Sequence, residues 1–295
     1  MTRSDVPGLP GDKILRALGR YHLLTRGQLT RLLYRPASTT FVGEHLTRLT
    51  RQGYLRMERV PLAIPVGGTP GYWMLREAGR RYLLTAGIEV PHPAPGPMTS
   101  PYHLWHLVAL NDALIALELL CRTDRALVLE RLRHDRDLRR NAPRVTLPDG
   151  RVTTVIPDAW IDLTVAGAPM GIALELDRGG EGGGEGERQW ARKLAGLLAL
   201  AAGPYRDTFA ADSITVAVIV TTGARRVAVL RRWTEQELER LGKTHWGELF
   251  WFAHADPAQT DPAALYLGAC WMQPFDPEPR PLIAIAEGDM DRVSG

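Results

Sequence analysis

Residues 46–55 read Leu-Thr-Arg-Leu-Thr-Arg-Gln-Gly-Tyr-Leu, and this run decides how the first third of the chain folds. Leu46 and Leu49 continue an apolar stripe with helical spacing, which predicts a helix over residues 38–52. Gly53 stands where the C-cap of a helix favours a left-handed residue. A β-rich stretch follows at once, so the run predicts a helix that turns directly into a strand.

Two shorter helices are predicted before this run, and a hairpin and a fourth helix after it. The predicted elements are a helix over 12–21, a helix capped by Thr25 and ending near Leu33, strands over 54–60 and 72–75, and a helix over 76–86. Three helices, a two-stranded hairpin and a helix follow one another in the order of a winged helix-turn-helix. The sequence therefore predicts such a domain over residues 12–89, after a disordered N-terminus at 1–11.

Polar and basic side chains lie off the apolar stripe of the predicted third helix. Short polar groups near its start and cations towards its end are typical of a helix that enters the major groove of DNA. The candidates for DNA contact on this helix are Thr39, Thr40, Gly43, Glu44, Thr47, Arg48 and Arg51. In the wing, Arg56 and Arg59 are candidates for phosphate contacts. A solvated amphipathic helix, a wing that docks a protein and a dimerisation module are the alternatives.

Length and charge agree with a small basic module joined to a larger one. The chain has 295 residues, which indicates two domains at roughly 150 residues per domain. Residues 1–90 hold 14 Lys and Arg against 6 Asp and Glu, whereas residues 91–295 hold 22 against 27. We therefore expect the first third to meet a polyanion, namely double-stranded DNA.

Several classes of protein are excluded by composition. With 45% hydrophobic and 23% charged residues, the chain is typical of globular proteins and not of disordered or fibrous ones. Cys121 and Cys270 are too few for a zinc site of their own or a disulfide framework. No apolar run approaches the ~20 residues of a membrane span, and residues 1–11 do not resemble a signal peptide. We expect a cytoplasmic protein without a membrane partner.

A proline-rich linker and a second domain follow. Residues 90–101 read VPHPAPGPMTSP, whose five prolines predict a stiff connector. The elements predicted beyond it are helices over 103–122, 187–202 and 224–241 and strands over 127–133, 152–165 (broken by Pro157), 171–177, 214–221 and 247–253. This α-β-β-β-α-β-α-β order over 102–255, a central mixed sheet flanked by helices, is that of a restriction-endonuclease-like domain. The fold class is α+β, with 256–295 as a covering segment and C-terminal tail.

Three acidic residues fall on the predicted sheet in a suggestive pattern. Asp158 lies in the second predicted strand, and Glu175 and Asp177 end the third on one face of it. This pattern resembles the PD-(D/E)xK nucleases, and the resemblance implies that the three acids hold Mg²⁺ or Mn²⁺ beside a scissile phosphate. Asp177 stands where that motif has Lys, and Lys193 in the next helix is the candidate that replaces it. Alternatively, Asp158 is a turn residue and Asp177 pairs locally with Arg178.

Five short segments resemble the replication-relaxation family of plasmid and mobile-element proteins. They are LLTRGQLTRLL at 23–33, YWMLREAG at 72–79, HLVALND at 106–112, IPDAW at 156–160 and ALELDRG at 173–179. The resemblance covers about residues 12–250 and implies a winged helix fused to a nuclease-like domain that acts on the DNA of a mobile element. It also implies that His106, Asn111 and Asp112 line the active cleft.

Three functions remain open at this stage. The first is a DNA-binding protein of a plasmid or mobile element, whose winged helix locates duplex DNA and whose nuclease-like domain binds it or cleaves it as a Mg²⁺- or Mn²⁺-dependent endonuclease. The second is a transcription or copy-number regulator with a catalytically inactive nuclease-like scaffold. The third is a recruiting subunit for a relaxase or a transposase. The missing motif Lys favours the second, and the three acids with Lys193 favour the first. A homodimer is compatible with each, since winged helices often read two half-sites.

Overall fold

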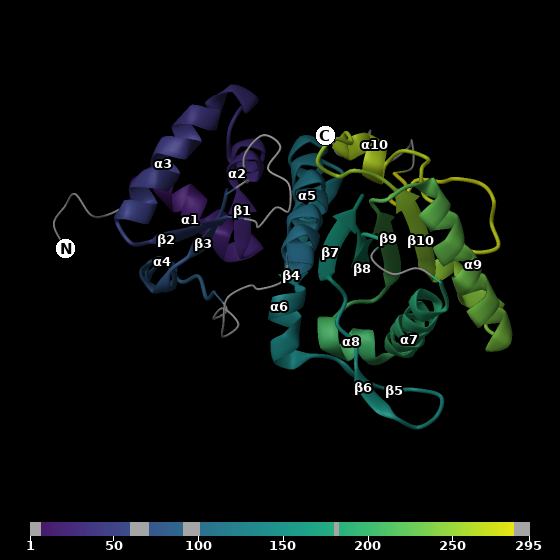
Figure 1. Cartoon of the computed structure of the whole chain (residues 1–295). Helices are drawn as coiled ribbons and strands as arrows, with labels where there is room; N and C mark the ends of the chain where they lie inside the picture. Colours follow the sequence, from purple (N-terminus) through teal and green to yellow (C-terminus); the bar gives the residue numbers. More distant parts are fainter. Residues whose placement is uncertain (1–6, 60–70, 91–100, 180–182, 286–295) are drawn as a thin grey trace. The chain divides into compact units, whose positions relative to one another are not determined.

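The computed structural model describes residues 7–59, 71–90, 101–179 and 183–285. The chain divides into two compact units, residues 1–115 and residues 116–295 (Figure 1). Both units combine helices with a sheet, and the larger sheet is mixed and flanked by helices. The prediction of a mixed helix-and-strand class is therefore confirmed.

The first unit begins with helices and continues into a small sheet. Its elements are α1 (Leu9–Tyr21), β1 (Leu23–Thr25), α2 (Arg26–Leu33), the 3₁₀ turn η1 (Pro36–Ser38), α3 (Thr39–Arg51), β2 (Leu55–Arg59), β3 (Gly71–Leu75) and α4 (Glu77–Thr85). All four predicted helices and both predicted strands are present within a few residues of their expected bounds. The turn predicted between the two strands falls largely on residues 60–70, outside the described residues.

Local capping explains where these helices begin and end. The Thr25 hydroxyl accepts a hydrogen bond from the N–H of Gln28, whose side chain accepts one from the N–H of Thr25, so α2 begins with a capping box. At the end of α3, Gly53 adopts φ +81°, a left-handed conformation that few other residues tolerate. On the inner face of α3, Leu46 and Leu49 are fully buried.

The sheet of the first unit has three strands in the order β1-β3-β2, all antiparallel. The β2–β3 hairpin is the one expected from the sequence, but β1 was not predicted. Leu23 of β1 lies opposite Met74 of β3, and both are buried with Tyr72. A three-residue strand is too short to show alternation, which is why its sequence gave no strand signal.

Helix α5 (Pro101–Thr123) belongs to both units, since the division falls between Ile115 and Ala116. This differs from the boundary predicted in the proline-rich segment, most of which lies outside the described residues. The difference arises because Leu104 of α5 packs with the sheet of the first unit. Among described residues, α5 alone is long and apolar enough to cross a membrane, but 61% of its most apolar window is buried, as in core helices.

The second unit is built on a larger sheet. Its elements are β4 (Leu127–His134), α6 (Asp135–Leu138), η2 (Arg139–Asn141), β5 (Arg144–Thr146), β6 (Val152–Thr154), β7 (Ala159–Val165), β8 (Ala168–Asp177), α7 (Gly183–Ala201), α8 (Pro204–Phe209), β9 (Thr215–Val220), α9 (Ala224–Arg240), η3 (Thr244–Leu249), β10 (Phe250–His254) and α10 (Pro262–Tyr266). The five-stranded sheet has the order β10-β9-β8-β7-β4. β4, β7 and β8 pair antiparallel, whereas β8, β9 and β10 pair parallel.

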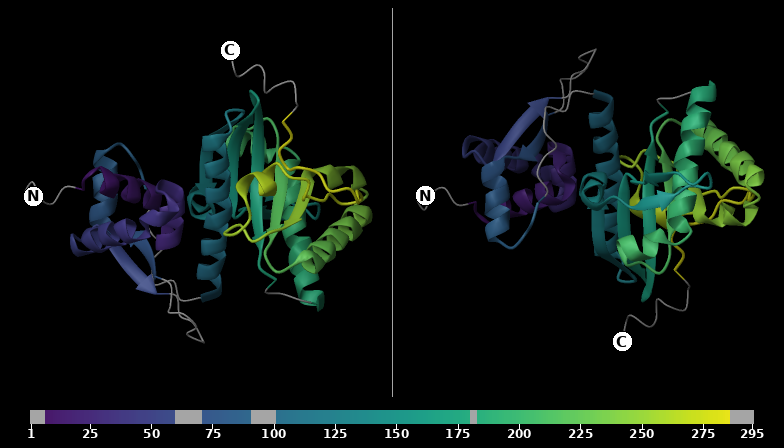
Figure 2. Two further views of the ribbon diagram at one scale, coloured as in Figure 1. Left: turned by 90° about the horizontal axis from the view of Figure 1, so that it is seen from above. Right: turned by 90° about the horizontal axis from the view of Figure 1, so that it is seen from below.

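Helices cover both faces of this sheet (Figures 1 and 2). α7 and α9 lie on one face, and the C-terminal half of α5 lies along the other. The α7–α9 side of the core contains Trp160 of β7, Ala173 of β8 and Val218 of β9. Because side chains alternate along β8, Glu175 and Asp177 point to the same face as Ala173, beneath α7 and α9.

Two segments need a comment against the sequence prediction. The strand predicted over 152–165 with a break at Pro157 is two separate strands, because β6 pairs with β5 in a hairpin and β7 joins the large sheet. Pro157 lies between them and lacks the N–H that a continuous strand would need. The segment predicted as a strand over 247–253 begins as η3 and becomes β10 only at Phe250.

The segment after β10 covers the core, as expected. Trp271 is fully buried, and its backbone pairs with Arg280 in an isolated bridge. Met272 forms a second bridge with Phe252 of β10. Residues 286–295 of the predicted tail lie outside the described residues.

Candidate functional site

Asp158 occupies the junction of three strands. The sequence predicted Asp158 inside a strand, but in the structure the residue immediately precedes β7. Its carboxylate Oδ2 accepts a hydrogen bond of 2.8 Å from the backbone N–H of Leu176 in β8, and its carbonyl accepts one of 2.9 Å from Asp135 N–H after β4. Although Asp158 lies outside the strand, these hydrogen bonds still hold its backbone and its side chain beside the end of β8.

Glu175 lies next to Asp158 and is almost fully enclosed. Its side chain is 2% exposed, and β8 pairs at this position with Val218 of parallel β9. The Nζ of Lys193 in α7 lies 2.5 Å from Oε2 of Glu175. Among described residues, neither carboxylate oxygen of Glu175 has a hydrogen-bond partner, although Oε2 is in ion-pair contact with Lys193, so this buried carboxyl group is left incompletely satisfied.

The electrostatics of this cluster are unusual for carboxylates. Burial raises the pKa of Glu175 to about 8, with the Lys193 charge opposing the shift and Asp158 adding to it. Burial alone would lower the pKa of Lys193, but the carboxylates of Glu175, Asp158 and Asp177 outweigh burial and raise it. Two adjacent carboxyl groups that share one lysine bind a cation or a proton readily, because either relieves their repulsion.

Asp177 has a different partner from the one expected. Both carboxylate oxygens accept hydrogen bonds from Arg226 in the first turn of α9, at 3.1 Å from Nε to Oδ1 and 3.0 Å from Nη2 to Oδ2. Oδ1 also accepts the N–H of Gly179 at 2.9 Å. The sequence allowed Asp177 to pair with its neighbour Arg178, but the ion pair that forms is with Arg226. Arg226 was not predicted as a partner, because 49 residues separate it from Asp177.

The three predicted metal ligands do not form one set. In the described parts of the chain, no three His, Cys, Asp or Glu side chains lie close enough together to hold a metal ion. Asp158 and Glu175 remain adjacent, with Oε1 of Glu175 unpaired, and Mg²⁺ is commonly held by one or two carboxylates together with water and phosphate oxygens. The residues present fit one Mg²⁺ or Mn²⁺ on Asp158 and Glu175, without Asp177.

A cavity elsewhere in the second unit contains none of these residues. Its volume is about 900 Å³, and it is lined by the β5–β6 hairpin, α7 and the C-terminal end of α9.

In the first unit, the predicted DNA-contacting residues largely face solvent. The exposed ones are Thr40, Glu44, Thr47, Arg48, Arg51 and Arg59, while Thr39, Gly43 and Arg56 are partly buried. Two of the cations also have local partners, since Arg48 Nη2 lies 2.6 Å from His45 Nδ1 and Arg56 Nη1 lies 3.3 Å from Glu58. Such contacts orient the guanidinium groups and leave most of their N–H donors available.

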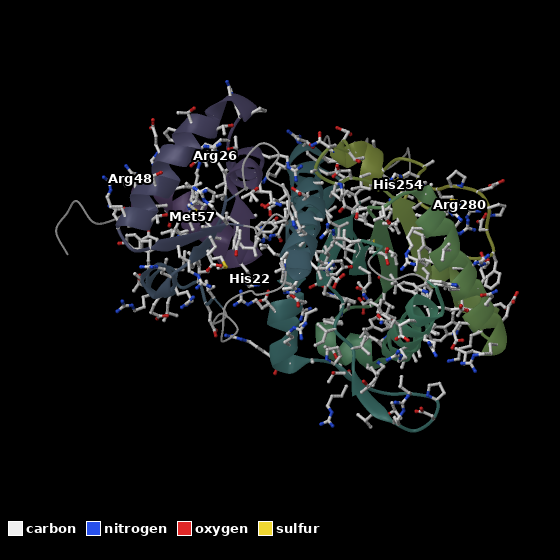
Figure 3. All side chains as sticks on the ribbon, in the orientation of Figure 1. His22, Arg26, Arg48, Met57, His254 and Arg280 are labelled. Atoms are coloured by element: carbon white, nitrogen blue, oxygen red, sulfur yellow. The ribbon has the colours of Figure 1, made fainter. Side chains whose placement is uncertain are left out.

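Three residues on this surface were not singled out from the sequence. Phe41 of α3 is 41% exposed although its ring packs edge-on against Tyr34, and Met57 of β2 is 42% exposed. A Cβ on Gly43 would lie 3.5 Å from the guanidinium of Arg26, so Arg26 of α2 adds a cation beside α3. Figure 3 labels Arg26, Arg48 and Met57 on the first unit. Exposed apolar side chains on an otherwise polar helix were the signal that could have found Phe41.

Asn111 and Asp112 serve packing within the first unit. The Asn111 amide donates hydrogen bonds to the carbonyls of Tyr21 at 3.3 Å and Leu23 at 2.7 Å, and it is fully buried. Asp112 forms an ion pair of 2.7 Å with Arg31 of α2. These contacts fasten α5 to β1 and α2, and the expectation that the pair lines an active cleft stays a prediction.

Comparison with known proteins supports one assignment. The family model described as replication-relaxation matches residues 15–216, about two thirds of the chain. Neither a curated protein nor a solved structure matches this chain. The matched region runs from α1 to β9 and includes Asp158, Glu175, Asp177 and Lys193. The chain belongs to the replication-relaxation family.

Proposed function

We propose that this protein binds duplex DNA through its first unit and cleaves a phosphodiester at the cluster of Asp158, Glu175 and Lys193 with the help of Mg²⁺ or Mn²⁺. The observation that carries the proposal is the approach of Lys193 Nζ to within 2.5 Å of the buried Glu175, beside Asp158. Membership in the replication-relaxation family agrees with this proposal, because the family name suggests a role in the replication of plasmids and mobile elements.

The element order of the second unit supports a nuclease-like domain. α5, β4, β7, β8, α7, β9, α9 and β10 follow one another in the α-β-β-β-α-β-α-β order of that fold, with the β5–β6 hairpin as an insertion. Sequential strand order brings the beginning of β7 beside the end of β8. Asp158 and Glu175 therefore meet although 17 positions separate them in the sequence.

Each side chain has a defined task in this proposal. Asp158 and Glu175 would hold the metal ion, which when bound polarises the scissile phosphate and lowers the pKa of an attacking water. Lys193 balances the charge of Glu175 and would also stabilise the negative charge that develops on the phosphate. Hydrogen bonding to Leu176 N–H keeps the Asp158 carboxylate oriented.

The first unit supports recognition of duplex DNA as a winged helix. α3 follows α2 after the short η1 turn and leads into the β2–β3 hairpin, which is the wing in this interpretation. Arg48 and Arg51 are exposed on α3, and Arg59 at the end of β2 extends the row of cations. These arginines would supply phosphate contacts, while Thr40, Glu44 and Thr47 would face base edges.

The test is incubation of the full chain with supercoiled plasmid in Mn²⁺ or Mg²⁺, beside the double variant Asp158→Ala/Glu175→Ala. Glu185→Ala is a matched control, because this acid lies on the exposed side of α7 with 56% of its side chain exposed. Nicking by the wild type and the control, but not by the double variant, is expected. Equal nicking by all three proteins would refute the assignment of the site.

A second function is favoured by one specific observation. Asp177 occupies the position of the motif Lys and is engaged by Arg226, so this site lacks the third residue of an ordinary nuclease motif. A regulator that binds DNA and keeps the nuclease-like unit as a scaffold would have this arrangement. Retention of DNA by the wild type and the double variant, with cleavage by neither, supports the regulator.

A further inference from the structure

We infer that Arg226 is a phosphate-contacting residue of the site and that Asp177 positions it. The inference rests on the proposed function, because it requires DNA to reach the cluster of Asp158, Glu175 and Lys193. It assigns Asp177, which the sequence pattern placed among the metal ligands, to a different task.

The contacts of Asp177 leave little room for a metal ion. Oδ2 accepts from Nη2 of Arg226, and Oδ1 accepts both Nε of Arg226 and the N–H of Gly179. The two side chains are 18% and 17% exposed, so the pair is largely removed from water. A carboxylate with both oxygens engaged by a guanidinium acts as an anchor for that guanidinium.

The guanidinium of Arg226 is also held from its face. Its Cζ lies 5.2 Å from the centre of the Trp233 ring, which is on the same helix. The ring therefore supports the flat face of the guanidinium group through a cation–π contact. Asp177 uses the Nε edge, and in the described residues Nη1 has no hydrogen-bond partner. The outer edge of the fork therefore remains free to donate two hydrogen bonds, a geometry that suits phosphate oxygens.

The pair of Asp177 and Arg226 lies close to the cluster of Asp158, Glu175 and Lys193. Glu175 and Asp177 are two residues apart on one face of β8, a separation of about 7 Å along a strand. Each carries its own cation, Lys193 on Glu175 and Arg226 on Asp177. Without Arg226, the negative charge of Asp177 would add to that of Asp158 beside an incoming phosphodiester, and this repulsion would oppose binding. Two cations held at neighbouring positions make the approach of DNA electrostatically favourable.

The experiment measures DNA affinity against salt with the full chain and a short fluorescein-labelled duplex, without divalent metal. Between about 50 and 200 mM NaCl, the slope of log K against log salt falls by about 0.9 for each phosphate contact that is lost. Arg226→Gln is expected to weaken binding about tenfold and to flatten the slope by that amount. Arg226→Lys is expected to keep the wild-type slope, because it keeps the charge. The matched control is Arg225→Gln, an exposed neighbour on α9, which is expected to leave the slope unchanged.

A second measurement tests the role of Asp177. The rise in melting temperature on addition of Mn²⁺ is expected to persist in Asp177→Asn and to disappear in Asp158→Asn. Loss of the Mn²⁺ response in Asp177→Asn would identify Asp177 as a metal ligand and overturn its assignment as an anchor.

The remaining outcomes separate a contact role from a structural one. If Arg226→Gln and Arg226→Lys lose thermal stability equally and share the same altered slope, Arg226 is a structural residue only and the inference is wrong. An unchanged slope in a stable Arg226→Gln also overturns it. Binding of DNA by the wild type without cleavage refutes the proposed reaction but leaves the Arg226 contact standing, whereas absence of DNA binding refutes both.

Discussion

Replacing Glu175 by glutamine is expected to flatten the dependence of stability on pH. The pKa of Glu175 is about 8 in the folded protein, against an ordinary value of 4.5. Between these values the unfolded chain releases a proton that the folded protein retains, so the free energy of unfolding of the wild type falls as the pH rises. Below pH 4.5 both states are protonated, and above about pH 8 both are ionised, so the effect is confined to this window.

The magnitude follows from the same values. Each pKa unit corresponds to about 1.4 kcal/mol, so the full difference is on the order of 5 kcal/mol. Lys193 is 39% exposed and can rearrange around the ionised carboxylate, which reduces the effect. We therefore expect about 2–3 kcal/mol between pH 5 and pH 8, or about 5–10 °C in melting temperature.

The assay is thermal melting by circular dichroism at intervals from pH 5 to pH 8, without divalent metal, for the wild type and Glu175→Gln. Taking the difference between the two proteins removes the contribution of the titrating groups that do not interact with Glu175. Glu185→Gln, with 56% of its side chain exposed, is the control and is expected to melt in parallel with the wild type. Parallel curves for the wild type and Glu175→Gln would show that Glu175 is not a buried carboxyl with a raised pKa, and the reasoning would be wrong.

Three further substitutions test packing and capping inside each of the two units. Gly171→Ala would place a Cβ 2.4 Å from the carbonyl oxygen of Ser213, so a loss of about 2–3 kcal/mol is expected in chemical denaturation, and a stability equal to wild type would contradict this close approach. Asn111→Leu leaves two backbone carbonyls of the first unit without their amide donors and is expected to lower stability by about 1–3 kcal/mol, seen as faster hydrogen exchange in β1; unchanged exchange would remove its proposed structural role. Thr25→Ala removes the cap that bonds Gln28 N–H and is expected to cost about 1 kcal/mol in melting experiments, whereas Thr25→Ser should retain most of it.

Much of the fold could be predicted from the sequence because its determinants are local. The apolar stripe through Leu46 and Leu49, the Thr25 cap and Gly53 each act within one or two turns of helix, so they fix helix ends without reference to the rest of the chain. Strand β1 is the counterexample, since three residues carry no periodic signal and become a strand only by pairing with β3.

The candidate site divides in the same way. The sequence by itself singled out Asp158, Glu175 and Lys193 as candidate site residues, because acidic residues at strand ends and a rare lysine in the next helix are visible as a pattern. Which of them meet was decided by tertiary structure. The packing of α7 on the sheet brings Lys193 to Glu175 across 18 positions, and the packing of α9 brings Arg226 to Asp177 across 49. No local pattern encodes such pairings, because they depend on strand register and helix placement, which the whole core determines at once.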